Sequence, residues 1–208
     1  DGTYKVKENS ILKPKSVYGK TKLNAEKIIE KELKKNKINY AILRFFNVCG
    51  ASPSNKIGQI NSYDLLFKNL ASSVLKKNPK INIYGNNYNT KDGTCIRDFI
   101  HVSDISDIHI KILKKISKIK KSYILNCGYG KGRSVKEIVK SFEKISNKKI
   151  KIFYKKRRNA DLSQIIANNN KLLKLIKWKP KFNNLSIMVK TSIRWEKKLN
   201  ERIRKNFK

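Results

Sequence analysis

The alternation of helix-like and strand-like segments is the feature that most limits what this chain can fold into. From residue 18 to residue 36, apolar side chains recur at roughly helical spacing, with Lys and Glu between them: Leu23, Ile28, Ile29 and Leu33. Residues 39–46 follow as a run of β-branched and aromatic residues of strand length. A helix, a short turn and a mostly apolar strand form half of a βαβ unit, so the expected fold is α/β, with a parallel sheet covered by helices.

The same alternation continues to the end of the chain. We expect further helices at residues 65–77, 104–118, 134–146 and 185–199, and strands at residues 81–84, 97–102, 122–127 and 149–154. Asp104 is a plausible helix N-cap, and Ser134 with Glu137 forms a capping box. Asp98 is interpreted as a turn residue and His101 as a structural histidine. The polar segment 85–94 is predicted to be a loop of the length that often carries function.

Composition narrows the class of protein. A chain of 208 residues with 39% hydrophobic and 9% aromatic residues can bury a core, which argues against a disordered chain. No stretch reaches the ~18 uncharged apolar residues of a membrane span, so no membrane partner is expected. The three cysteines, Cys49, Cys95 and Cys127, include no CxxC pair. This argues against a disulfide framework or a zinc site, and for a reducing cytoplasm.

The charge raises the possibility of a nucleic-acid partner. Fifty Lys and Arg against fifteen Asp and Glu give a formal net charge of +35, which is typical of proteins that bind phosphate backbones. Only eight of the fifty are Arg, the residue best suited to phosphate and base contacts. The lysines are also spread over the whole chain, apart from the short basic run at residues 155–158. We therefore expect no nucleic acid, and keep a basic nucleic-acid-binding protein as an alternative.

Tyr18 and Lys22 are candidates for catalysis. Their spacing of four places both side chains on one face of the predicted helix. A neighbouring ammonium favours the deprotonated form of a phenol, which can then take a proton from a sugar hydroxyl. The pair alone is a weak signal, because an ordinary solvated helix face accounts for it equally well.

Three longer blocks give the pair a context. Residues 16–22 (SVYGKTK), 43–50 (LRFFNVCG) and 92–104 (DGTCIRDFIHVSD) occur in an order and spacing that resembles the extended short-chain dehydrogenase/reductase superfamily of sugar-nucleotide enzymes. The loop at residues 84–94 narrows the resemblance to the UDP-glucose 4-epimerases. Similar stretches at residues 126–130, 157–162 and 178–195 extend it over essentially the whole chain.

The resemblance implies NAD as the cofactor and a UDP-hexose as the substrate. Tyr18 looks like the base that removes the proton from the sugar O4 while hydride passes from C4 to NAD⁺. The transient 4-keto sugar then turns over and takes the hydride back on its other face. Lys22 looks like the residue that bonds the nicotinamide ribose and tunes the tyrosine, and Phe46 matches the residue beside the nicotinamide ring.

The resemblance also implies a set of substrate-binding residues. Asn47 matches a contact to the diphosphate, Arg97 and Arg158 match the cations that neutralise it, and Asp161 matches an acceptor for the uridine ribose hydroxyls. The segment Asn82, Ile83 and Tyr84 corresponds to the one that lines the uridine. Two positions depart from the family pattern. Leu65 falls where an Asn often touches the diphosphate, and Ile165 replaces a bulkier Tyr beside the sugar's 2-substituent, which leaves room for N-acetylhexosamine nucleotides.

The domain organisation follows from the resemblance. Residues 1–50 and 99–127 are expected to belong to a Rossmann-like NAD-binding domain, and residues 51–98 and 128–208 to a smaller nucleotide-sugar-binding domain. Only seventeen residues precede Tyr18, and they contain no Gly-rich strand-turn-helix. We therefore expect the C-terminal portion of an epimerase that on its own binds NAD poorly and is inactive. The resemblance also suggests a homodimer. The alternative within the superfamily is a nucleotide-sugar dehydratase or decarboxylase.

Overall fold

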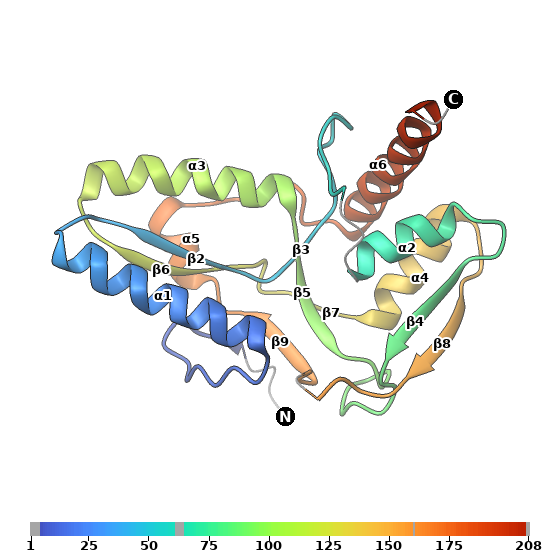
Figure 1. The fold of residues 1–208 in the computed structure, drawn as a ribbon, viewed down its shortest axis with the longest axis horizontal. Coiled ribbons are helices and arrows are strands. Elements are labelled where there is room, and N and C mark those ends of the chain that lie inside the picture. Colours follow the sequence, from blue (N-terminus) through green and yellow to red (C-terminus); the bar gives the residue numbers. More distant parts are fainter. Residues whose placement is uncertain (1–4, 61–64, 160, 207–208) are drawn as a thin grey trace.

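The computed structural model describes residues 5–60, 65–159 and 161–206 and has a mixed α/β fold. At one end of the molecule two long helices lie on opposite sides of a parallel strand pair (Figure 1). Ser16 caps the first of these helices by accepting a hydrogen bond from the Gly19 amide. The elements at this end are α1 (Val17–Lys35), β2 (Ala41–Phe45), α3 (Val102–Ile119), β6 (Tyr123–Cys127) and α5 (Asn170–Ile176).

A second group of elements forms the other end. Three helices pack against one another and against a second parallel strand pair. The polar loop at residues 85–94 lies below that strand pair in Figure 1. These elements are α2 (Leu66–Val74), β4 (Lys80–Tyr84), α4 (Val135–Ser146), β8 (Lys151–Lys155) and α6 (Leu185–Asn206). The loop needs glycine at Gly93, where φ is +77° and a Cβ atom would lie 2.2 Å from the Asn86 carbonyl oxygen.

A central sheet joins the two ends. Its strands pair in the order β1-β9-β5-β3, all in parallel, and β7 adds to β5 in the antiparallel sense. Because β2 continues directly into β3, the chain passes from the strand pair at one end into this sheet. The strands are β1 (Lys5–Val6), β3 (Asn47–Cys49), β5 (Ile96–His101), β7 (Gly132–Ser134) and β9 (Gln164–Ala167).

The apolar core divides into two clusters that follow the two ends. One is built from α3, β6 and α5 and includes Ile108, Leu125 and Leu172, each fully buried. The other is built from α2, α4 and α6 and includes Leu70 and Phe142, also fully buried. The expected parallel sheet covered by helices is confirmed. Burial of the regularly spaced apolar residues stabilises both clusters.

The expectations for two acidic residues, one in α3 and one on the preceding strand, are wrong. Asp104 does not cap this helix. The N-cap is His101, whose Nδ1 accepts a hydrogen bond from the Ser103 amide at 3.1 Å. Asp104 lies in the first turn of the helix, where its carboxylate accepts hydrogen bonds from the Tyr129 hydroxyl and from the Lys181 and Phe182 amides. The Asp104 carboxylate therefore connects α3 to distant parts of the chain and does not cap the helix.

Asp98 is likewise not a turn residue. It lies on β5, fully buried, and accepts hydrogen bonds from the amides of Tyr129, Gly130 and Ala167. By contrast, Ser134 is confirmed as the N-cap of α4, because its hydroxyl accepts a hydrogen bond from the Glu137 amide at 3.0 Å. The Glu137 carboxylate of the expected capping box pairs with Arg133 instead. The interpretation of His101 as a structural histidine is also confirmed by its burial and its hydrogen bonds. Within the described residues, no helix is long and apolar enough to cross a bilayer.

Candidate active site

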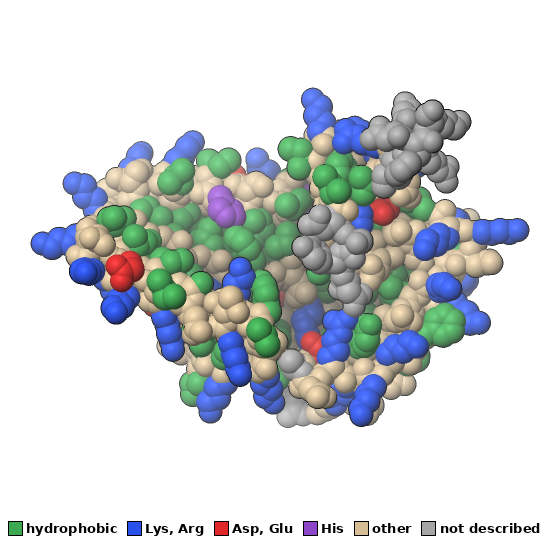
Figure 2. All heavy atoms as spheres, viewed as in Figure 1, with side chains coloured by type: hydrophobic (Ala, Val, Ile, Leu, Met, Phe, Trp, Pro, Cys, Tyr) green, Lys and Arg blue, Asp and Glu red, His purple; other side chains and the backbone are tan. Residues whose placement is uncertain are grey.

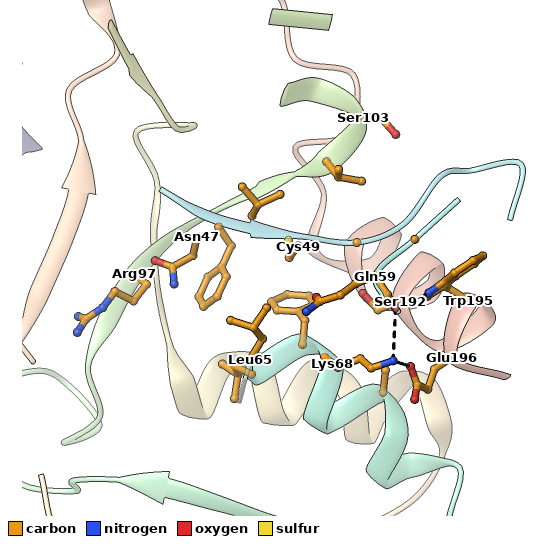
Figure 3. A pocket seen from close by; sticks show the side chains of 18 of the residues that line it. Asn47, Cys49, Gln59, Leu65, Lys68, Arg97, Ser103, Ser192, Trp195 and Glu196 are labelled. Atoms are coloured by element: carbon orange, nitrogen blue, oxygen red, sulfur yellow. Dashed lines mark hydrogen bonds and ion pairs between the residues drawn. The ribbon is translucent and has the colours of Figure 1, made fainter. Parts of the chain in front are cut away.

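The main cavity lies between the central sheet and the helices α2 and α6, and it has a volume of about 780 Å³. Strand β3 and the segment that follows it form one long wall, and the first turn of α3 contributes to the rim (Figure 3). Arg97 lies toward one end of the cavity, and Lys68, Trp195 and Glu196 lie toward the other (Figure 3). The cavity therefore suits an elongated ligand.

Arg97 anchors the charged end. It projects from β5 and is only 9% exposed, because its guanidinium donates hydrogen bonds to the carbonyl oxygens of Ile96 and Leu162. Its other terminal nitrogen lies 3.3 Å from Oδ1 of Asp161, which also lines the cavity. These contacts hold a planar fork of donors in one orientation, which suits a phosphate or carboxylate ligand.

A second guanidinium lines the same end. Arg158 lies at the cavity wall, and its Cζ atom stacks 3.9 Å from the centre of the Tyr84 ring. The adjacent Arg157 stacks in the same way on Tyr88, at 4.0 Å. The aromatic residues of the loop at 84–94 therefore fix the basic segment that follows β8.

The other end of the cavity is closed by a buried ion pair. Lys68 on α2 and Glu196 on α6 lie 2.5 Å apart, and their side chains are 11% and 6% exposed. The backbone oxygen of Gln59 accepts hydrogen bonds from the Lys68 ammonium at 3.4 Å and from the Trp195 indole at 2.8 Å. Gly58 packs so closely on the Trp195 ring that a Cβ atom there would lie 2.5 Å from it. These contacts hold the segment after β3 as a fixed wall.

The structure brings four of the predicted site residues together. Asn47, Arg97, Arg158 and Asp161 all line the main cavity, although they come from three separate stretches of the chain. Leu65, at the position where the resemblance leads one to expect Asn, lines it as well.

The predicted catalytic pair lies on a different element. Tyr18 is in the first turn of α1 and is 73% exposed, and the Lys22 ammonium lies 5.5 Å from the centre of its ring. Phe46 lies between β2 and β3 and is half-buried. None of these three residues lines the main cavity. The Tyr18 ring and the Lys22 ammonium are therefore close together, as predicted, and they lie on an exposed side of α1.

Four other predicted substrate residues lie outside the cavity, and one of them, Tyr84, reaches it only through its stacking on Arg158. Ile83 is 3% exposed within the core cluster of α2, α4 and α6, so only its backbone is available to a ligand. Asn82, on the opposite face of β4, is exposed and lines a separate hollow with Lys76 and Lys80. Ile165 lies on β9, where it pairs with Arg97 in the sheet register. It is thus next to the charged end without lining it.

Sequence reasoning missed the residues that close the far end: Gln59, Lys68, Trp195 and Glu196. Lys68 and Glu196 are far apart in the chain, and neither stands in a recognisable motif, so only the folded structure pairs them. It also missed Cys95, which lines the cavity beside Arg97. Burial raises the pKa of the Cys95 thiol, which disfavours the nucleophilic thiolate. No cluster of three or more metal-ligating side chains occurs among the described residues.

Comparison with known proteins places these features in a family. The family model described as the NAD dependent epimerase/dehydratase family matches residues 2–128. A UDP-glucose 4-epimerase of Azospirillum brasilense is 34% identical over 199 residues, which are 95% of this chain and 57% of that protein. The chain therefore spans little more than half the length of this relative.

Solved structures show the same relation. The UDP-glucose 4-epimerase from Stenotrophomonas maltophila, solved with bound NAD and formylated UDP-arabinopyranose, matches with a TM-score of 0.88 at 28% identity. The match covers 94% of this chain and 59% of that one. The UDP-Glc/GlcNAc 4-epimerase from Campylobacter jejuni matches with a TM-score of 0.75 at 38% identity, over 93% of this chain and 59% of that one. The fold is thus the Rossmann-like fold of these enzymes.

Proposed function

The chain belongs to the NAD-dependent epimerase/dehydratase family, and we propose that it forms the substrate-binding and proton-transferring part of a UDP-hexose 4-epimerase. The reaction inverts the configuration at C4 of the sugar through a transient 4-keto intermediate. The UDP-glucose/UDP-galactose pair is the proposed substrate, because the relatives named above include UDP-glucose 4-epimerases.

One observation carries this proposal. Asn47, Arg97, Arg158 and Asp161 come from distant parts of the sequence and converge on one elongated cavity. Two guanidinium groups neutralise a diphosphate, and a carboxylate beside them accepts hydrogen bonds from ribose hydroxyls. The sugar attached to this diphosphate then lies at the charged end, next to Ile165, with its O4 directed toward α1.

The residues on α1 have a separate task. The Tyr18 hydroxyl takes the proton from the sugar O4 and later returns it, and the Lys22 ammonium lies 5.5 Å from the centre of the Tyr18 ring. The Tyr18 and Lys22 side chains also fit NAD, because a hydroxyl and an ammonium on one exposed flank suit a nicotinamide ribose. Phe46, which is half-buried, would lie beside the nicotinamide ring. When bound, NAD supplies the hydride acceptor and donor at C4.

Ile165 is proposed to determine which sugar substituents the site accepts. It is smaller than the tyrosine that some family members carry there, and its strand pairs with Arg97 at the charged end. We propose that UDP-N-acetylhexosamines are accepted as well as UDP-hexoses. Competition between UDP-galactose and its N-acetyl analogue checks this, and complete preference for UDP-galactose contradicts it.

The activity is tested by replacing Tyr18 with Phe. The chain is fused to the part of the Azospirillum brasilense epimerase that it does not match, and conversion of UDP-galactose to UDP-glucose is followed. Loss of the hydroxyl removes the proton acceptor, so turnover should fall by a factor of about 10² or more while UDP binding is unchanged. The control is Tyr154→Phe, on β8 and 42% exposed, which should keep full turnover. A Tyr18→Phe enzyme as active as the control contradicts the assignment.

A further inference from the structure

The basic segment at residues 156–158 carries one of the two cavity arginines, Arg158, although the whole segment is exposed. Figure 2 shows basic and acidic side chains lying together in a hollow between the two ends of the molecule. A long side chain that is free in water has many rotamers, and the cost of ordering it is subtracted from the binding free energy. The contacts that hold this segment therefore bear on how tightly the cavity binds an anion.

The residue next to Arg158 makes a contact of its own outside the cavity. Arg157 does not line the cavity, and its Cζ atom lies 4.0 Å from the centre of the Tyr88 ring. This is well within the range of a cation–π interaction. Within residues 5–60, 65–159 and 161–206, no hydrogen bond or ion pair joins Arg157 to another side chain. The stack on Tyr88 is thus the specific contact of this guanidinium.

Tyr88 contributes its ring and not its hydroxyl. It belongs to the polar loop at residues 85–94, yet it is only 3% exposed. A buried tyrosine normally donates or accepts a hydrogen bond through its hydroxyl. The Tyr88 hydroxyl has no such partner in the part of the chain that the structure describes. The aromatic face that receives Arg157 is therefore what the fold uses at this position.

Gly85 permits the close approach of this pair. Its φ is +86°, and a Cβ atom there would lie 2.5 Å from Cε2 of Tyr88 and 2.6 Å from Cγ of Arg157. Its amide donates a hydrogen bond to the Lys155 carbonyl oxygen at 2.8 Å, at the end of β8. The loop and the basic segment thus meet at a point where only glycine fits.

The loop that carries Tyr88 is itself held by hydrogen bonds. The Tyr88 amide donates to the Gly93 carbonyl oxygen at 2.9 Å, which closes the loop. The Asp92 carboxylate accepts hydrogen bonds from the Thr94 amide at 2.9 Å and from the Ser134 hydroxyl at the start of α4. The Tyr88 ring is therefore a fixed platform, tied to a helix of the core.

We propose that Tyr88 and Arg157 are positioning residues for the nucleotide: their stack fixes residues 156–158 on the loop, so that Arg158 presents its guanidinium to the diphosphate in one orientation. The proposal rests on the proposed function, because it takes the diphosphate as the ligand of Arg158. Tyr88 and Arg157 themselves do not touch the ligand, since neither lines the cavity. Arg157 acts through its planar stacked shape and not through its charge.

The variant Arg157→Lys separates shape from charge. Lysine keeps the positive charge but lacks the planar guanidinium that stacks on a ring. Calorimetric titration of the 208-residue chain with UDP should show binding weakened about five- to tenfold. Arg157 is exposed, so the melting temperature should not change. The control is Arg202→Lys, the same change at an exposed arginine of α6 whose Cζ lies 5.9 Å from the Trp195 ring. It should bind UDP as the unchanged chain does.

Two variants of Tyr88 test the other half of the stack. Tyr88→Phe keeps the ring and loses the unpaired hydroxyl, so it should keep the UDP affinity of the unchanged chain. Tyr88→Leu removes the ring and should weaken UDP binding as much as Arg157→Lys does. The double variant Tyr88→Leu/Arg157→Lys should bind no more weakly than either single variant, because the two residues act as one unit. In the fused enzyme these changes should raise KM for UDP-galactose and leave kcat unchanged.

The outcomes distinguish this proposal from the proposed function. If the unchanged chain does not bind UDP, the proposed function fails and the positioning role fails with it. If the unchanged chain binds UDP and Arg157→Lys binds it as tightly as Arg202→Lys does, only the positioning role is overturned. Weak binding in Arg157→Met together with full affinity in Arg157→Lys would also overturn it, because Arg157 would then act through its charge. Arg157→Lys gives this answer even where Tyr88→Leu does not fold.

Discussion

At the residue scale, His101 shows how one side chain joins the parts of the fold. It is fully buried, its Nε2 lies 3.1 Å from the Thr191 hydroxyl on α6, and its ring stacks on Phe182 at 4.7 Å. Since Nδ1 accepts a hydrogen bond from the Ser103 amide, the neutral ring carries its proton on Nε2. Burial lowers the pKa of His101 to about 4 and outweighs the opposite effect of Asp104.

This pKa predicts a loss of stability in acid. The unfolded chain takes up a proton near the ordinary histidine pKa of about 6.5, whereas folded His101 stays neutral until pH 4 is approached. The unfolded state therefore binds more protons between these values, and the free energy of unfolding falls by as much as about 3 kcal/mol as the pH drops through this range. Urea unfolding at pH 7 and pH 4.5 measures it. His101→Asn should be less stable at pH 7 but lose less on acidification; an unchanged pH slope contradicts the assignment.

The sequence predicted the role of individual residues where a local pattern determines it. The charged end of the cavity was predicted because Arg97, Arg158 and Asp161 stand in recognisable motifs. The burial of Asp98 and the actual contacts of Asp104 depend on chain segments more than 20 residues away, such as Tyr129 and Phe182. No local pattern encodes them, so capping and turn preferences gave the wrong expectation.

At the element scale, the periodic segments were predicted well and the short ones were missed. The helix α1 and the strands β2 and β6 carry strong repeats of apolar residues and lie within a few residues of their expected bounds. The elements β7, β9 and α5 were not expected. They are three, four and seven residues long, and sheet pairing or packing decides their structure more than their own sequence does.

Two serines at opposite ends of α4, Ser134 and Ser146, provide a test of local energetics. Ser134 caps the helix and also donates a hydrogen bond to Asp92, whereas the Ser146 hydroxyl is buried with no hydrogen-bond partner among the described residues. Ser134→Ala should lower the free energy of unfolding by about 1–2 kcal/mol. Ser146→Ala should leave it unchanged or raise it. Chemical denaturation of both variants checks this, and equal effects would contradict the capping role.

At the scale of the whole molecule, the cavity depends on contacts between distant elements. Lys68 on α2 and Glu196 on α6 are both nearly buried, so removing one partner leaves a charge without compensation. Lys68→Met should cost about 3 kcal/mol of stability, and Lys68→Met/Glu196→Leu should recover most of that loss. Thermal unfolding of the single and double variants provides the comparison. A double variant as unstable as the single one would show that the pair is not the cause.

The division into two domains remains a proposal. We propose that residues 1–50 and 99–127 form one unit, and residues 51–98 and 128–208 the other. The two apolar clusters support it in outline, although Leu172 and Trp178 pack with α3 and β6 in the first unit's cluster. From the sequence alone, residues 170–178 are assigned to the second unit because they follow it in the chain. In the structure, Leu172 and Trp178 pack on α3 and β6 and so belong with the first unit.

The cavity with Arg97 and Arg158 is proposed to bind the nucleotide of a UDP-sugar. Calorimetric titration of the 208-residue chain with UDP tests it most directly. Arg97→Met and Arg158→Met should each weaken binding about 10- to 100-fold, and Arg202→Met, on the C-terminal part of α6, should not. One UDP per chain and this order of affinities are the expected results. No UDP binding, or the same affinity in all three variants, would contradict it.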